Sequence, residues 1–228
     1  MTPIYIAGIA MTVFGRHLDR SLDDLAREAL DGALKDAGCT SGDLGVAFYA
    51  GMTNGPLQGQ ISIPGQVVFS KIGVDGIPIY NVENACASGS TAFHLAIQSL
   101  RAGNADVALA LGAEKMNIPD KAKAFAIFEG GWDVSRAEDN YQTLIKMGEG
   151  VEVPPGSESD RPYSKFMSIY AGFCRLHMKT YGTTQRQIAA VSAKNHQHSV
   201  HNPYSQIRKP FTIEEILAAP PITYPLTL

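Results

Sequence analysis

Residues 81–96 of the 228-residue chain read NVENACASGSTAFHLA, and they join a predicted strand to a predicted helix. The strand covers 76–82, and an apolar segment with helical spacing follows at 90–103. Cys86 lies on the turn between them, at the edge of an open α/β sheet where ligands bind. The free N–H groups of a first helical turn stabilise a thiolate, so Cys86 is a candidate nucleophile. A lone cysteine is also common as a buried structural thiol, and the turn alone leaves both interpretations open.

Strands and helices alternate through the first half of the chain. The helix between Ser21 and Gly38 has a capping box, Ser21 with Asp24, and a glycine C-terminal stop. The predicted strands cover 3–10, 45–51, 76–82 and 105–115, with further helices within 63–73 and at 90–103. We expect the first strand, 3–10, to be buried on both faces. This alternation predicts an α/β fold with a mainly parallel sheet covered by helices.

The sequence changes character after residue 116. Residues 131–164 are polar, rich in Gly and Pro, and predicted to be irregular. Helices then follow at 165–182 and after two capping boxes, Thr184 with Gln187 and Thr212 with Glu215. The last residues, 220–228, are apolar and favour β structure, as expected where a further part of a fold would begin. We predict two domains, a core at 1–115 that carries the nucleophile and a loop-rich cap region at 116–228.

Composition excludes several classes of function. The net charge of −3, from 19 basic and 22 acidic residues, is too balanced for nucleic-acid binding by charge. The first apolar stretch is interrupted by Gly8, so we expect neither membrane insertion nor a signal peptide. Cys39, Cys86 and Cys174 form no C-x-x-C pair, so no disulfide scaffold and no metal site is predicted. A cytoplasmic protein, or an organelle-matrix protein in a eukaryote, fits best.

A family resemblance adds to this interpretation of Cys86. Residues 81–117 resemble the nucleophile segment of the thiolase superfamily, and residues 6–17, 177–203 and 212–228 agree. The similarity is greatest to sterol-carrier-protein-X-type and lipid-transfer-like thiolases, which resemble acetyl-CoA acetyltransferases. It implies a thiolase-like N-terminal βαβαβα half with a mainly parallel central sheet, followed by a helical and loop-rich cap, with the second thiolase half absent.

The resemblance also implies a reaction. Cys86 would take an acyl group from an acyl-CoA thioester, in 3-oxoacyl-CoA thiolysis or Claisen condensation, as part of fatty acid and lipid metabolism. Coenzyme A and acyl-CoA would be substrates, with no cofactor bound permanently, and the cap would carry much of the CoA contact. No CoA-binding residue is identified in this sequence. Thiolases pair their subunits near the nucleophile strand, which implies a homodimer.

The sequence departs from the family because it lacks the second half, which supplies a histidine, an oxyanion motif and usually a second cysteine. His94 cannot replace them, because it lies about 12 Å along the helix from Cys86 by helical rise. We therefore expect activity only with a complementing C-terminal half or a small partner subunit, which would also cover exposed apolar surface. Two alternatives are a retro-aldol lyase of acyl-CoA esters that acts with a partner protein and a non-catalytic CoA- or lipid-binding module.

Overall fold

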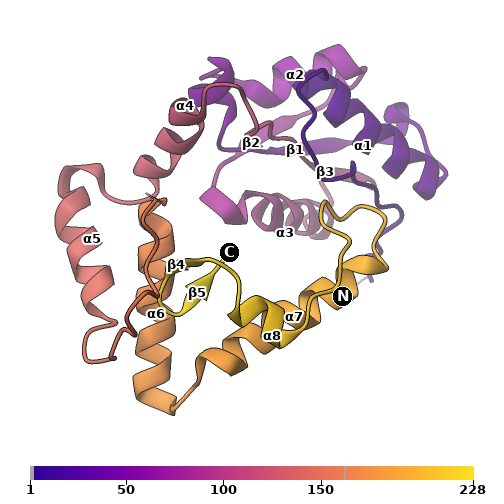
Figure 1. Cartoon of the computed structure of the whole chain (residues 1–228). Coiled ribbons are helices and arrows are strands. Elements are labelled where there is room, and N and C mark those ends of the chain that lie inside the picture. Colours follow the sequence, from indigo (N-terminus) through magenta and orange to yellow (C-terminus); the bar gives the residue numbers. More distant parts are fainter. Residues whose placement is uncertain (1–2, 162) are drawn as a thin grey trace. The chain divides into compact units, whose positions relative to one another are not determined.

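A computed structural model gives the structure of the chain, and it describes residues 3–161 and 163–228. The chain divides into two compact units, Met1–Gly131 and Trp132–Leu228 (Figure 1). The first unit holds the parallel sheet, and the second is mostly helical. The first unit continues past residue 115 because the helix α4, Lys121–Ala126, and a 3-10 turn at Ile127–Gly130 belong to it.

The centre of the first unit is a three-stranded parallel sheet. Its central strand β1, Val46–Ala50, is buried along its whole length and lies between β2, Ile79–Val82, and β3, Ala108–Gly112. The register aligns Phe48 with Tyr80 on one side and with Ala110 on the other. All three strands fall within predicted ranges, so the predicted α/β class is confirmed.

Helices cover both faces of this sheet (Figure 1). Helices α1, Leu22–Ala37, and α2, Pro64–Ile72, cover one face, and α3, Ser88–Arg101, covers the other. The side chains that form the α1/α2 core include Leu30, Tyr49, Phe69, Leu109 and Leu111. Those that face α3 include Val46, Phe48, Ala50, Ala92 and Ala96. Because alternate residues of β1 belong to different clusters, the strand is apolar on both faces.

Helix α1 follows the sequence prediction at both ends. The Ser21 hydroxyl accepts a hydrogen bond from the N–H of Asp24, and the Asp24 carboxylate accepts one from the N–H of Ser21. Gly38 ends the helix with φ 67°, in the left-handed region that favours glycine. The predicted capping box and stop are therefore confirmed.

The predicted first strand is wrong, because residues 3–10 are extended but form no strand. The side chain of Tyr5 is 80% exposed and that of Ile6 is 67% exposed. The segment lies on α1, where the N–H of Ile9 donates to the Asp36 carboxylate at 2.9 Å. Gly8 permits this approach, since a Cβ there would come within 2.3 Å of the Ala33 carbonyl oxygen. A strand needs a hydrogen-bonded neighbour, and residues 3–10 have none in the described part of the chain.

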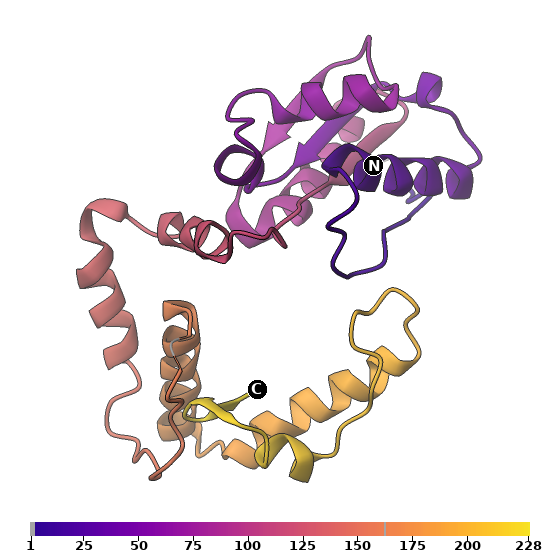
Figure 2. The same cartoon turned by 45° about the horizontal axis from the view of Figure 1, so that its top comes forward.

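The second unit contains two helix pairs and a small hairpin. Helix α5, Ala137–Lys146, packs beside α6, Lys165–Tyr181 (Figure 2). Helix α7, Gln185–Val200, packs with α8, Ile213–Leu217, and both begin at the predicted capping boxes. The hairpin joins two short antiparallel strands, β4 at Pro221–Thr223 and β5 at Leu226–Thr227.

Helix α5 lies inside the stretch that the sequence predicts to be irregular, so that prediction is wrong for residues 137–146. Its charges suit a helix, with Glu138 and Asp139 in the first turn and Lys146 in the last. Because Gly- and Pro-rich residues flank this short segment, the sequence pattern predicts a loop there and not a helix. None of the described helices is both long and apolar enough to cross a membrane.

Candidate active site

Cys86 lies in a 3-10 turn, Ala85–Ala87, that leads directly from the end of β2 into α3. Its side chain is exposed, as are those of the neighbours from Glu83 to Ala87. The turn is at the carboxyl edge of the parallel sheet, where open α/β folds bind ligands. The Cys86 thiol is therefore accessible in this chain and is not a buried structural thiol.

The backbone of this turn is strained beside the cysteine. Ala85 has φ 46°, a left-handed conformation that costs an L-residue about 1–2 kcal/mol. The Glu83 carboxylate holds it there by accepting a hydrogen bond from the N–H of Ala85 at 2.6 Å. A strained residue next to a nucleophile at a strand-to-helix turn is also the arrangement of a nucleophile elbow.

Ser88 fixes the turn to the first turn of α3, a role that its position in the sequence hardly indicates. Its side chain is 5% exposed. The Ser88 hydroxyl accepts from the N–H of Asn84 at 2.9 Å and donates to the carbonyl oxygen of Ala85 at 2.7 Å. The Asn84 side-chain amide donates to the Thr91 hydroxyl at 3.0 Å. Asn84 and Ser88 therefore shape the turn that presents Cys86.

The N–H of Cys86 has no acceptor within the part of the chain that the structure describes. The N–H groups of its neighbours Ala85 and Ala87 are both occupied, by the Glu83 carboxylate and the Asn84 carbonyl oxygen. A free N–H on the nucleophile itself can donate to the oxyanion that forms when the thiolate attacks a carbonyl.

The other two cysteines are less suited to catalysis. Cys39, just after α1, and Cys174, in α6, are both half-buried. Burial raises the pKa of the Cys174 thiol, and the opposing effect of the Arg175 guanidinium is smaller. A raised pKa leaves less thiolate at neutral pH, so Cys174 is the weaker nucleophile.

The histidines have other surroundings. His94 is exposed on α3. His177 hydrogen-bonds to the Thr183 hydroxyl at 2.8 Å, and His196 packs edge-on against Phe211 with ring centroids 4.8 Å apart. Among residues 3–161 and 163–228, no cluster of three His, Cys, Asp or Glu side chains could hold a metal ion.

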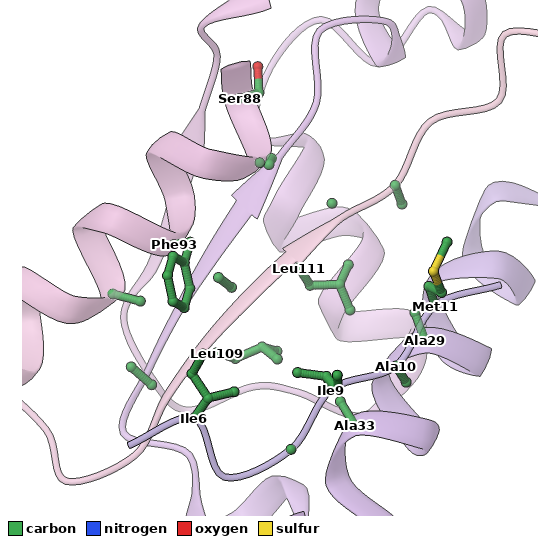
Figure 3. A pocket seen from close by; sticks show the side chains of 18 of the residues that line it. Ile6, Ile9, Ala10, Met11, Ala29, Ala33, Ser88, Phe93, Leu109 and Leu111 are labelled. Carbon is green, nitrogen blue, oxygen red and sulfur yellow. The ribbon is translucent and has the colours of Figure 1, made fainter. Parts of the chain in front are cut away.

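A large apolar cavity of about 1170 Å³ lies beside the turn and reaches Cys86 at one end. Its walls come from the N-terminal segment, α1, α3 and β3, whose side chains converge on the cavity (Figure 3). The cavity lies wholly within the first unit. Cys86 therefore lies at the end of an apolar space and is not an isolated surface thiol.

Comparison with known proteins identifies the family. The model of the family described as "Thiolase, N-terminal domain" matches residues 4–216. The chain belongs to the thiolase family. This confirms the resemblance carried by residues 81–117 and places the match in the N-terminal domain of thiolases.

Curated relatives of this thiolase-family chain are longer than it is. Sterol carrier protein 2 of Gallus gallus is 33% identical over 94% of this chain and 36% of that protein. Acetyl-CoA acetyltransferase of Methanothermobacter thermautotrophicus is 31% identical over 100% of this chain and 53% of that protein. The chain thus spans about half, or less, of the length of these relatives.

A solved structure agrees with the fold. The Ltp2-ChsH2(DUF35) aldolase superposes with a TM-score of 0.66 at 22% identity, covering 98% of this chain and 50% of the matched chain. The chain accordingly has the fold of one half of a thiolase, as predicted.

Proposed function

We propose that this chain carries the nucleophile of a thiolase-type acyltransferase, in which Cys86 forms an acyl-enzyme with coenzyme A thioesters. The observation that carries the proposal is the exposed Cys86 on a strained turn at the start of α3. The relative named acetyl-CoA acetyltransferase, aligned over the whole chain, supports the same reaction class.

The first step is attack of the Cys86 thiolate on a carbonyl carbon. With a 3-oxoacyl-CoA, sulfur adds to the keto carbon, and the resulting oxyanion accepts a hydrogen bond from the N–H of Cys86. The oxyanion collapses, the bond between C2 and C3 breaks, and the acetyl-CoA carbanion leaves and takes a proton. An oxyanion donor of this kind contributes about 10²–10³ in rate in enzymes where it has been removed.

The second step regenerates the thiolate. The thiolate of free coenzyme A attacks the acyl-Cys86 carbonyl, and the shortened acyl-CoA leaves. In the reverse direction, the carbanion of a second thioester attacks the acyl-enzyme and forms a carbon–carbon bond, which is Claisen condensation. Coenzyme A enters and leaves as a substrate throughout, and one thioester replaces another of similar energy.

Each step needs a general base that takes the proton of the thiol. We assign this base to the part of the longer relatives that this chain does not cover. His94 is on the exposed surface of α3, and Glu83 is already engaged with the N–H of Ala85. The proposal also assigns residues 116–228 to a cap over the CoA part of the substrate. Activity therefore depends on the complementing half.

An isotope-exchange assay tests this function. We define the extended chain as residues 1–228 followed by the remaining part of the Methanothermobacter enzyme, and assay transfer of the acetyl group from acetyl-CoA to labelled coenzyme A. Exchange should occur in the extended chain and in its Cys174→Ala variant, and fall to the uncatalysed rate in Cys86→Ala. Cys174→Ala is the matched control because it also removes one thiol. Equal exchange in Cys86→Ala would overturn the proposal, and lyase turnover that survived this substitution would favour the retro-aldol alternative.

A further inference from the structure

A second cavity, which we call the side cavity, lies at the carboxyl edge of the parallel sheet. Its volume is about 500 Å³, the size of a small-molecule site, and it lies wholly within the first unit. Gly51 and Met52 line both the side cavity and the larger cavity that reaches Cys86. The two cavities therefore adjoin just beyond the end of β1.

Part of the wall of the side cavity is apolar and strained. Ile61 and Ile63 line it, and their side chains are 83% and 57% exposed. Ile63 has φ 48°, in the left-handed region, which is a genuine outlier for a β-branched residue. Strained residues of this kind collect at active sites and ligand sites. The two exposed isoleucines therefore suit contact with the apolar part of a ligand.

Asn54 supplies the side cavity with a buried acceptor that has no partner. Its side chain is 3% exposed, and the residue lines the cavity. The Asn54 amide nitrogen donates to the Tyr49 hydroxyl at 2.9 Å, but the Asn54 carbonyl oxygen Oδ1 has no donor in the described part of the chain. A buried acceptor without a donor is costly, so its presence at a cavity calls for an explanation.

The hydrogen-bond network fixes which end of the Asn54 amide is free. The Tyr49 hydroxyl donates its hydrogen to the Ala113 carbonyl oxygen at 3.1 Å, so it can only accept from Asn54. Gly51 also leaves room for the oxygen in this position, since a Cβ there would lie 2.7 Å from Asn54 Oδ1. The free group of Asn54 is therefore its oxygen.

The other polar side chains of the side cavity also leave oxygen atoms free. The side-chain amide nitrogens of Gln60 and Asn81 already donate within the fold. The Glu83 carboxylate accepts from the N–H of Ala85 through Oε1, and Oε2 has no donor among the residues that the structure describes. Free acceptors select a ligand group that donates, such as a hydroxyl or an ammonium. A carboxylate or phosphate would instead bring a second negative charge beside Glu83.

We propose that the side cavity holds the far end of the acyl group carried by Cys86, and that this end bears a hydroxyl or amino group that donates to Asn54 Oδ1. The apolar part of the acyl chain packs against Ile61 and Ile63 and passes Met52, a flexible side chain that can adapt to it. The inference names a substrate class for the acyltransferase and rests on the proposed function. It assigns Asn54 to substrate selection and not to the chemical step.

Binding of small alcohols to the 228-residue chain tests the side cavity without any activity measurement. Pentan-1-ol and its isomer methyl butyl ether differ in the hydroxyl donor, and amide chemical shifts follow both titrations. Pentan-1-ol should shift the amides of Asn54, Gly55 and Ile61 and bind about tenfold more tightly than the ether, the worth of one hydrogen bond. Equal affinities, or shifts outside the side cavity, would overturn the proposal. Tighter binding of pentylammonium than of the alcohol would assign the donor as an amino group, and the reverse order would assign a hydroxyl.

Two neighbouring substitutions show whether Asn54 is responsible. Asn54→Leu removes the free oxygen at nearly constant size and should reduce the preference for the alcohol to about one. Thr53→Val is the matched control, because Thr53 is 0% exposed and its Oγ1 also lacks a partner, yet it does not line the side cavity. The preference should persist in Thr53→Val, and a preference that also persisted in Asn54→Leu would contradict the assignment. If Asn54→Leu does not fold, the comparison of the two isomers in the unsubstituted chain decides.

Thioester selectivity in the extended chain separates this inference from the proposed function. Hexanoyl-CoA and 6-hydroxyhexanoyl-CoA are compared as acyl donors to labelled coenzyme A. The hydroxylated thioester should have the higher kcat/KM, by about tenfold, and this ratio should fall to about one in Asn54→Leu. Equal kcat/KM for the two thioesters would overturn the inference and leave the acyltransferase intact. Absence of transfer from both, with pentan-1-ol still bound, would overturn the proposed function instead.

Discussion

Replacing Ala85 by glycine should stabilise the chain, whereas the same change two residues later should destabilise it. Ala85 has φ 46°, and Ala87 has φ −94°. Both side chains are exposed, so each substitution removes one methyl group with little loss of packing. The pair isolates the backbone strain beside Cys86 from all other effects of a glycine.

The magnitude follows from two opposing contributions. Glycine relieves about 1–2 kcal/mol of left-handed strain at residue 85. It also adds unfolded-state entropy that costs about 0.5–1 kcal/mol at either position. Ala85→Gly should therefore raise the free energy of unfolding by about 0.5–1 kcal/mol, and Ala87→Gly should lower it by about 0.5–1 kcal/mol. The two variants should differ by about 1–2 kcal/mol.

Urea unfolding followed by circular dichroism measures both values in parallel. We expect Ala85→Gly to slow acetyl exchange several-fold in the extended chain despite its greater stability, because the freer turn no longer fixes the Cys86 N–H. Equal destabilisation by both substitutions would show that Ala85 carries no strain and would refute the elbow geometry.

Three further outcomes follow from burial and packing. Burial raises the pKa of Tyr49 from its usual 10.0 to about 12. The contribution of Tyr49 to the free energy of unfolding is therefore complete below pH 10. It falls by about 2–3 kcal/mol as the pH rises toward 12. Tyr49→Phe should remove this pH dependence in unfolding measurements. Iodoacetamide should alkylate exposed Cys86 before Cys174, whose thiol pKa is raised by burial, and peptide mapping would reveal the opposite order. Gly65→Ala should lower the free energy of unfolding by about 1–3 kcal/mol, because its Cβ would lie 2.6 Å from the Tyr49 Cβ. Gly89→Ala, which meets no atom within 4 Å in α3, should instead raise it by about 0.5–1 kcal/mol, and equal effects of the two would contradict the packing.

Local sequence signals predicted most of the α/β unit correctly. The capping box at Ser21 and the stop at Gly38 depend only on neighbouring residues, and the structure confirms both. The strand-to-helix turn at Cys86 was readable for the same reason, since the apolar period changes there from strand to helix.

The failures arise where structure depends on distant partners. Residues 3–10 are apolar enough for a buried strand, but pairing requires a neighbour that the sequence pattern cannot supply. The left-handed Ala85 could not be predicted either, because alanine seldom adopts that conformation. The buried position of Ser88 depends on how the turn folds back over α3, so its sequence signal was that of an ordinary helix-start serine.

Intact-protein mass spectrometry after brief exposure to acetoacetyl-CoA shows directly whether Cys86 accepts an acyl group. We expect an acetyl-sized mass gain in the extended chain and in its Cys174→Ala variant, mapped to Cys86 by peptide analysis and absent in Cys86→Ala. No mass gain, or a gain that maps to Cys39 or Cys174, would contradict Cys86 as the acyl-accepting nucleophile.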